Sequence, residues 1–358
     1  MRKSRFSAPA SAGTLLLAIL SLTVFNRALA SGSTDPAPGS SITRLENFAR
    51  DPLTQGWTLF GDANLFRWNS TSQNLEVTWD SSRSNSYLQL PLGTVLSRTD
   101  DFRVELDLLL HEIAGGIRID RPGPMQLAFG FQNRSDAQSS RFNRGTGTDS
   151  PNLVEFNFFP DTGFGPTVWP AVYSTNSGPN YNGGDEFSLF DLPTGITMHI
   201  ELAYTSSNQT VLTAIRANGT LIGPITSAYL ATNATSLSRP FTQFEVDTFA
   251  ISSYSDLALA PSPYAGSLLA RGVIDNLTIT FPSPPIQEEQ FRLADGYWEQ
   301  SVLSRGDWHY RLQATTDFRT WMDLTEVQKG TGGRLVLRGT AREPNTSHFY
   351  RIHASPAR

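Results

Sequence analysis

The sequence predicts an all-β protein, built as an antiparallel β-sandwich followed by a small β domain. Short segments in which apolar and polar residues alternate recur along the chain, as expected of strands that bury one face. Asn, Asp, Gly, Ser and Pro fill the connections between these segments. No long stretch has the period of an amphipathic helix. These three observations together favour strands throughout.

Residues 1–30 have the pattern of a secretory signal peptide. Two arginines and one lysine give a positive start, residues 14–25 are an apolar run too short to span a bilayer, and Ala-Leu-Ala at 28–30 is a small-x-small cleavage site. An uncleaved membrane anchor is the alternative. Residues 31–41, rich in Ser, Pro and Gly, are expected to form a flexible leader. We therefore expect a secreted or cell-surface protein with no integral membrane segment after cleavage.

Composition narrows the class of protein. The chain has no cysteine, so an exported form cannot be a disulfide scaffold and needs a core that is stable alone, which favours a bacterial origin. The formal net charge is −5. An acidic chain without a Lys/Arg cluster argues against nucleic acid as a partner.

A domain boundary is expected near the prolines at residues 282–285. Residues 31–284 carry 14 basic and 24 acidic residues, whereas residues 285–358 carry 10 and 9. This change in charge coincides with the proline-rich stretch. We therefore assign residues 42–284 to the first domain and residues 285–358 to a small second domain.

The strands of the first domain follow from period-two alternation bounded by turn residues. Residues 186–192 are the only stretch expected to form a helical turn. Asn-Gly at 218–219 is a strong signal for a tight turn. The predicted strands are residues 45–48, 57–60, 65–68, 75–79, 86–90, 102–110, 125–131, 152–159, 196–204, 210–216, 244–253 and 272–281.

The strand at residues 152–159 carries the candidate site. Val154, Phe156 and Phe158 are apolar, and they alternate with Glu155, Asn157 and Phe159. Successive side chains of a strand point to opposite faces, so one face is apolar and the other offers an acid, an amide and a ring. The preceding strand has Gln and small residues on one face. Together these polar faces suit a shallow binding groove.

Two irregular segments lie beside this strand in the sequence. Residues 133–150 form a long polar insert, and residues 173–185 combine two tyrosines with Asn and Gly. Aromatic rings beside amides suit stacking on a sugar ring and hydrogen bonding to its hydroxyls. A solvated loop with a packed tyrosine is the alternative. The candidate ligand residues are Glu155, Asn157, Trp169, Tyr173 and Tyr181.

Two motifs resemble the concanavalin A-like lectin/glucanase superfamily, in particular the versions found in bacterial secreted proteins. They are His199-x-Glu201-Leu-x-Tyr204 with its following Asn-Gly turn, and the closing Arg-Gly-Val-Ile-Asp-Asn-Leu-Thr-Ile-Thr of residues 271–280. The resemblance covers residues 42–281. It implies a jelly roll whose concave sheet binds or cleaves polysaccharide, and hence a glycan partner.

The resemblance bears on catalysis as well. Laminarinase-like members carry Glu-x-Asp-x-x-Glu on a concave strand, and Glu155 and Asn157 stand at the matching positions here, with Phe-Phe-Pro where the second Glu is expected. Retaining hydrolysis needs two carboxyl groups about 5 Å apart. With one carboxylate on this strand, we expect a non-catalytic carbohydrate-binding or adhesion protein. A glycoside hydrolase with a displaced acid pair and a structural envelope protein without a small ligand are the alternatives.

The resemblance also implies a structural calcium ion. Superfamily members often hold Ca²⁺ on the convex side through a carboxylate of the last strand and oxygens near the start of the domain. Asp275 occupies the matching place, and Asp51 and Asp62 would supply oxygen ligands. The alternative is that Asp275 and Asn276 cap or bridge strand ends.

The second domain alternates again over residues 308–314, 334–338 and 348–353. Its pattern, with Trp321 and a closing Phe-Tyr-Arg-Ile, resembles a small β domain that recurs at the C-termini of bacterial secreted proteins. Trp321 is expected in its core.

Overall fold

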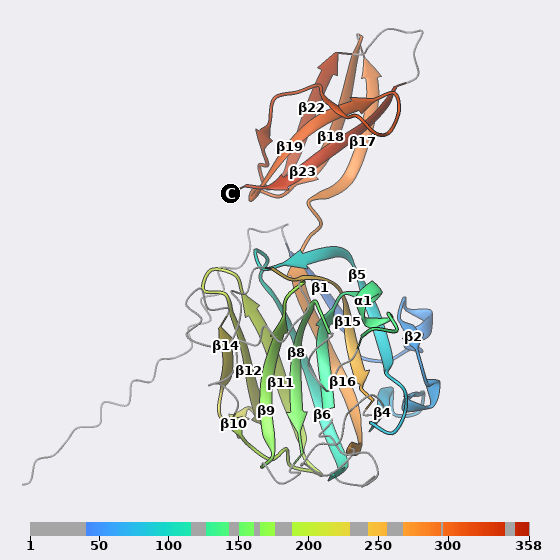
Figure 1. The fold of residues 1–358 in the computed structure, drawn as a ribbon, viewed down its shortest axis with the longest axis vertical. Coiled ribbons are helices and arrows are strands. Elements are labelled where there is room, and N and C mark those ends of the chain that lie inside the picture. Colours follow the sequence, from blue (N-terminus) through green and yellow to red (C-terminus); the bar gives the residue numbers. More distant parts are fainter. Residues whose placement is uncertain are drawn as a thin grey trace, which may run out of the picture. The chain divides into compact units, whose positions relative to one another are not determined.

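The computed structural model describes residues 41–115, 127–142, 150–160, 165–175, 188–229, 243–255, 268–294, 296–340 and 348–357. Almost every regular element in these ranges is a strand (Figure 1). The exceptions are the α-helix α1 (Arg134–Ala137) and the 3-10 helices η1 (Pro52–Thr54) and η2 (Ala63–Leu65). The predicted all-β fold, a jelly-roll sandwich followed by a small C-terminal β domain, is confirmed.

A nine-stranded antiparallel sheet forms one layer of the sandwich. Its order is β13-β12-β11-β6-β16-β4-β3, with β1 paired to β16 and β14 paired to β12. The strands are β1 (Ser41–Glu46), β3 (Phe66–Asn69), β4 (Asn74–Asp80), β6 (Phe102–Gly115), β11 (Thr197–Thr205), β12 (Thr210–Ala217), β13 (Thr220–Leu221), β14 (Thr226–Tyr229) and β16 (Leu268–Pro282).

A seven-stranded antiparallel sheet forms the other layer, and it contains the candidate strand. Its order is β10-β9-β8-β7-β15-β5-β2. The strands are β2 (Thr58–Phe60), β5 (Ser86–Ser97), β7 (Leu127–Gln132), β8 (Leu153–Phe159), β9 (Thr167–Tyr173), β10 (Ser188–Leu189) and β15 (Glu245–Ser253). Because β8 lies between β7 and β9, it is an interior strand with neighbours on both sides.

The two sheets share one hydrophobic core between their inward faces. Along β6 every second residue from Phe102 to Leu110 is buried. Phe102 meets Phe131 of the opposite sheet with ring centroids 4.7 Å apart, and Phe131 in turn meets Phe249 at 5.8 Å. Burying this many large side chains supplies the main stabilising free energy, since apolar burial contributes roughly 25 cal/mol per Å². Such a core is consistent with a chain that has no cysteine.

The C-terminal part has a hydrophobic core of its own. A three-stranded sheet has the order β17-β18-β22, and a four-stranded sheet has the order β20-β19-β21 with β23 paired to β19. Val302, Tyr310, Leu312 and Leu337 are among the residues buried between them. The strands are β17 (Ile286–Ala294), β18 (Tyr297–Ser304), β19 (Trp308–Thr315), β20 (Met322–Asp323), β21 (Gln328–Lys329), β22 (Arg334–Thr340) and β23 (Phe349–Pro356).

Arg305 makes buried polar contacts outside that second core. Its guanidinium donates to the carbonyl of Ser283 at 3.2 Å and to the Asp100 carboxylate at 3.0 Å. It also donates to both carboxylate oxygens of Asp307. These carboxylates raise the pKa of Arg305 even though burial opposes the charge.

Local turn chemistry matches the sequence expectation at the predicted hairpin. β11 and β12 pair antiparallel, and β12 and β13 are then joined across Asn218 and Gly219. Both turn residues have positive φ, 49° and 74°, as a two-residue hairpin turn of the primed type requires.

Three features of the fold differ from the sequence expectation. The predicted helical turn at residues 186–192 is wrong in its described part, because Ser188–Leu189 pair with β9 as β10. β9 was not predicted, since Pro170 interrupts its alternation. Trp321 lies outside the C-terminal core, half-buried, with the Arg351 guanidinium carbon 3.9 Å from its ring centroid.

Residues 1–40 lie outside the described residues, so the expected signal peptide and leader fall there. Within the described residues, no helix has the length and apolar character needed to cross a membrane.

Candidate functional site

Four of the five predicted ligand residues share one face of the seven-stranded sheet. Glu155 lies opposite Ala171, Asn157 opposite Trp169, and Leu153 opposite Tyr173. Residues directly opposite in an antiparallel pair point to the same side. We call this side, which points away from the nine-stranded sheet, the outer face. Its three cross-strand rows are Gln89, Ala250, Gly130, Glu155 and Ala171; Tyr87, Ser252, Ala128, Asn157 and Trp169; and Pro91, Thr248, Gln132, Leu153 and Tyr173.

Glu155 is buried in the first of these rows. The residue is 2% exposed, and the Tyr254 hydroxyl donates to its Oε2 at 2.7 Å. Such a bond is required here, because a carboxylate buried without partners is strongly destabilising. Gly130 lies beside Glu155, and a Cβ at that position would come within 2.4 Å of the Val154 carbonyl oxygen. Glycine therefore lets β7 and β8 approach closely at the point where Glu155 is held.

Trp169 and Phe159 are more exposed than Asn157, their neighbour on the outer face. Asn157 is buried, whereas Trp169 and Phe159 are half-buried, with ring centroids 6.2 Å apart and planes inclined by 52°. This pair places two aromatic rings next to a side-chain amide.

Of the two tyrosines predicted to contact a ligand, one lies within the described residues. Tyr173 is on the outer face but buried, at 3% exposure. Tyr181 lies outside the described residues.

Two further polar residues of this region, Gln89 and Tyr254, were missed by sequence reasoning. Gln132 was expected on the polar face of its strand from the alternation of β7, and it lies on the outer face. Gln89 and Gln132 are both buried, and each Nε2 has no hydrogen-bond partner within the described residues. Tyr254 has no local signal, because it lies 99 residues from the glutamate that it contacts.

Part of the outer face, on which the sequence predicted a shallow groove, is covered by a neighbouring segment. We call residues 133–142 the cover segment; it contains α1, which Figure 1 shows beside β5 and β15. Gln138 Nε2 donates to Gln89 Oε1 at 2.8 Å, and the Phe142 ring meets Tyr87 at 6.4 Å. The described part of the polar insert thus packs onto the outer face at Gln89 and Tyr87.

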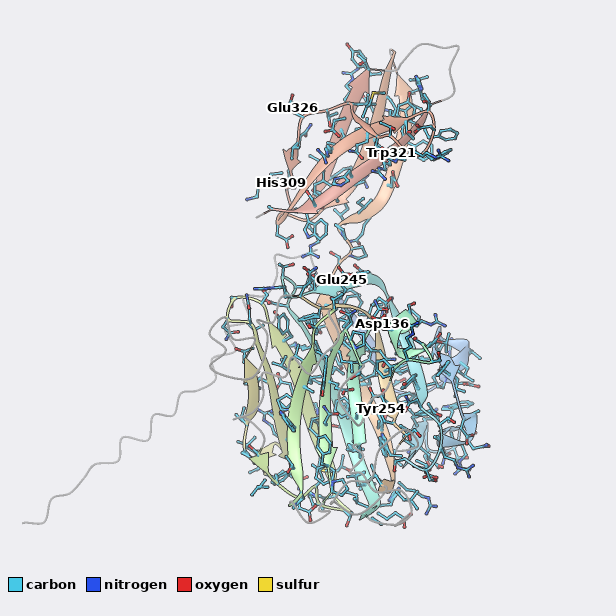
Figure 2. All side chains as sticks on the ribbon, viewed as in Figure 1. Asp136, Glu245, Tyr254, His309, Trp321 and Glu326 are labelled. Atoms are coloured by element: carbon cyan, nitrogen blue, oxygen red, sulfur yellow. The ribbon has the colours of Figure 1, made fainter. Side chains whose placement is uncertain are left out.

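The three rows of the outer face contain a single carboxylate, that of Glu155. Asp136 and Asp247 lie nearby, but both serve the cover segment: Asp136 accepts from Asn152 and Asp247 from the backbone N–H of Arg134. Figure 2 labels Asp136 and Tyr254 on the sandwich. The arrangement provides no second carboxylate facing Glu155 from these rows, as double-displacement glycoside hydrolysis needs.

A separate pocket of about 230 Å³ lies beside β1, lined by residues that include Arg44, Glu46 and Trp57. Arg44 donates to the carbonyls of Pro91 and Leu92, and Glu46 accepts from Trp57 Nε1 and the Phe48 amide. The Arg44 guanidinium and the Glu46 carboxylate therefore hold β1 and the following loop in place.

The predicted calcium ligands serve local structure. The Asp51 side chain accepts from the Leu53 amide and caps η1, and the Asp62 side chain accepts from the Asn64 amide and caps η2. Within the described residues, no group of three or more His, Asp and Glu side chains is placed to hold a metal ion.

Asp275 lies on β16 within an acidic patch of the nine-stranded sheet. Burial and the neighbouring Asp107 carboxylate raise its pKa, although the Asn276 amide donates to it at 2.7 Å. Asp107 in turn accepts from Asn276 Nδ2 and pairs with His199 Nδ1 at 2.9 Å. Asn276 has φ 48° at a bulge, so these residues bridge an irregular point in the sheet.

Comparison with known proteins gives similar solved structures but no family. No family model matches the chain, and no curated protein matches its sequence. Peanut lectin with a 9mer peptide has a TM-score of 0.41 and 14% identity, over 67% of this chain and 97% of that one. Lectin II from Ulex europaeus has 0.42 and 12%, over 67% and 97%. Lectin I from Ulex europaeus, in complex with the methyl glycoside of α-L-fucose, has 0.39 and 11%, over 68% and 98%.

The chain is therefore similar to legume lectins over about two thirds of its length. A similarity of this degree assigns no ligand to this chain. The two-sheet sandwich itself is established by its own strand pairing.

Proposed function

We propose that this chain is an exported, non-catalytic carbohydrate-binding or adhesion protein whose ligand site is the outer face of the seven-stranded sheet. The observation that carries the proposal is the placement of Glu155, Asn157 and Trp169 side by side on that face. An acid, an amide and an aromatic ring in adjacent rows match the chemistry of a sugar. A pyranose offers C–H surfaces for stacking and hydroxyls that both donate and accept.

A test of this proposal starts from the half-buried ring. Trp169→Ala removes the stacking surface while leaving the buried rows in place. We expect its affinity for a glycan selected on a broad array to fall about two- to tenfold, since a well-placed aromatic contact contributes roughly 0.5–1.5 kcal/mol and 1.4 kcal/mol is a factor of ten. Binding is measured by titration calorimetry on the mature chain.

Trp321→Ala is the matched control, because Trp321 is also half-buried but lies on the C-terminal domain. Equal losses in the two variants, or none in Trp169→Ala, would contradict a site on the outer face. Release of reducing sugar that stops in Glu155→Gln would instead establish a hydrolase.

One observation favours a structural role without a small ligand. Glu155 and Asn157 are buried, so neither touches solvent in the closed arrangement. If the folded wild-type protein binds no glycan with calcium or without it, the structural role becomes the better account.

Export and a calcium ion at Asp275 remain proposals. Amino-terminal sequencing of protein recovered outside the cytoplasm would test cleavage after residue 30. A melting temperature that rises with calcium in the wild type but not in Asp275→Asn would support the ion.

A further inference from the structure

The cover segment is attached unequally at its two ends. Near its start, the Arg134 amide donates to Asp247 at 2.9 Å, and Asp136 accepts from Asn152 Nδ2 at 2.7 Å. Asn133 caps α1 through the Asp136 amide. These bonds tie the first turn to the edges of β8 and β15, so this end is a fixed attachment.

Among the described residues, the far end of the cover segment makes neutral contacts with the sandwich. One amide–amide bond joins Gln138 to Gln89, and Asn85 Nδ2 donates to the Phe142 carbonyl at 3.4 Å. The Phe142 ring lies 6.4 Å from Tyr87 and 6.3 Å from Tyr254. Neutral hydrogen bonds are weaker than hydrogen bonds to a carboxylate, such as those that Asp247 and Asp136 accept near the start of the segment.

The surface beneath the cover segment holds a buried amide donor without a partner. Gln89, whose Oε1 accepts from Gln138, is 0% exposed, yet its Nε2 has no partner among the described residues. A buried donor left unpaired is destabilising. The closed arrangement therefore holds an amide donor that an acceptor-bearing ligand would satisfy.

We propose that residues 133–142 form a displaceable cover over a polar binding floor, and that Gln89 belongs to that floor. Release of Gln138 and Phe142 opens the floor, while α1 stays attached at its start. The ligand class is a hydroxylated compound with an oxygen that accepts from the Gln89 amide. This inference rests on the proposed function for the identity of the ligand, but not for the opening itself.

Opening couples directly to affinity. If the binding-competent open form is a fraction of the population, the apparent Kd exceeds the intrinsic Kd by the inverse of that fraction. Gln138→Ala and Phe142→Ala should therefore raise the open fraction. Each should lower the apparent Kd of a glycan that reaches the floor, by up to the factor by which the open fraction increases.

Thiol accessibility measures opening without any ligand. The chain has no cysteine, so a single introduced thiol is a clean probe. Ser252 is on the outer face between Tyr87 and Ala128, whereas the next residue, Ser253, points inward and accepts from the Asp80 amide. Both are buried, at 2% and 1% exposure. Ser252→Cys and Ser253→Cys thus compare opposite faces at the same strand end.

We expect the thiol of Ser252→Cys to react with an aromatic disulfide reagent at least tenfold faster than that of Ser253→Cys under native conditions. Adding Gln138→Ala or Phe142→Ala should speed the first reaction about tenfold further and leave the second unchanged. Ala250→Cys serves as the outer-face probe if Ser252→Cys does not fold. Equal rates on the two faces, or rates that both cover variants leave unchanged, would overturn the cover.

The outcome separates the two proposals. If the Ser252→Cys thiol reacts fast but the protein binds no glycan, the displaceable cover is supported and the glycan proposal is contradicted. If the protein binds a glycan but the thiol does not react, the displaceable cover is contradicted and the ligand is confined to Trp169 and Phe159.

Discussion

At the scale of single residues, Gly130 and Asp275 differ in how the residue type affects stability. Gly130 is required by space, because backbone atoms of β8 occupy the volume of a side chain there. Asp275 instead carries an electrostatic cost, since burial and Asp107 both disfavour its charge. Residues that cost stability without an evident structural gain are commonly kept for function.

Gly130→Ala should destabilise the fold. Its Cβ would lie 2.4 Å from the Val154 carbonyl oxygen and 2.5 Å from the Glu155 Cα, both of them backbone atoms. We expect a loss of about 1–3 kcal/mol, the usual cost of overpacking, measured by urea unfolding. Gly333→Ala is the control, because Gly333 does not have a positive φ and the nearest atom to a Cβ there is the Thr331 hydroxyl at 3.7 Å. A loss for Gly130→Ala no larger than that for Gly333→Ala would contradict the steric account.

The raised pKa of Asp275 predicts how stability depends on pH. A carboxyl that binds its proton more tightly in the folded state than in the unfolded state loses stability as pH rises from the unfolded pKa to the folded one, and the full cost is present above both. Asp275→Asn removes this cost and keeps an oxygen for the Asn276 amide. We expect its melting temperature at pH 7 to exceed that of the wild type by about 1–2 °C, the scale of surface substitutions.

The difference should shrink as pH falls below the folded pKa of Asp275, which thermal melts at a series of pH values would show. A variant that is less stable at pH 7 in calcium, but not in chelator, would indicate that the carboxylate holds a cation.

At the scale of elements, local chemistry specifies strands and tight turns, but it does not specify where a long connection packs. The β11–β12 pair and the Asn218-Gly219 turn are determined locally, because alternation and positive-φ residues specify a hairpin without outside help. The cover segment is determined by distant partners, since Gln138 reaches Gln89 across 49 residues. A polar composition predicted a connection there, but not where it packs.

At the scale of the whole molecule, two separate hydrophobic cores account for a chain without disulfides, and a buried ion pair adds a long-range polar link. Arg305 and Asp100 are 205 residues apart in sequence, and their side chains are 8% and 4% exposed. Asp100 also accepts from the Ser97 amide. Such a network constrains geometry because each member depends on the others.

Arg305→Ala should be strongly destabilising, because it leaves the Asp100 carboxylate buried without its cation. We expect a loss of about 3–5 kcal/mol by urea unfolding, as for other buried pairs broken on one side. Arg292→Ala is the comparison: Arg292 pairs with Glu299 but is 73% exposed, and exposed pairs contribute about 0–1 kcal/mol. Similar losses in the two variants would show that the Asp100 carboxylate finds other partners.

The sequence by itself determined the all-β class, most strand positions and the two-faced character of β8. Period-two alternation reports directly which side chains share a face, and turn residues report where a strand ends. Glu155, Asn157, Trp169 and Tyr173, which the sequence named as candidates, share one face of the sheet, although β9 itself was not predicted.

What covers the outer face of the seven-stranded sheet became known from the three-dimensional packing. Alternation distinguishes two faces but does not say whether the second is solvated, because that depends on segments far away in the chain. The residues that close the outer face, Tyr254 and the cover segment, contact it through packing rather than through any local pattern. Asp51 and Asp62 cap short helices in the structure, because their carboxylates accept hydrogen bonds from the backbone amides two residues further along the chain.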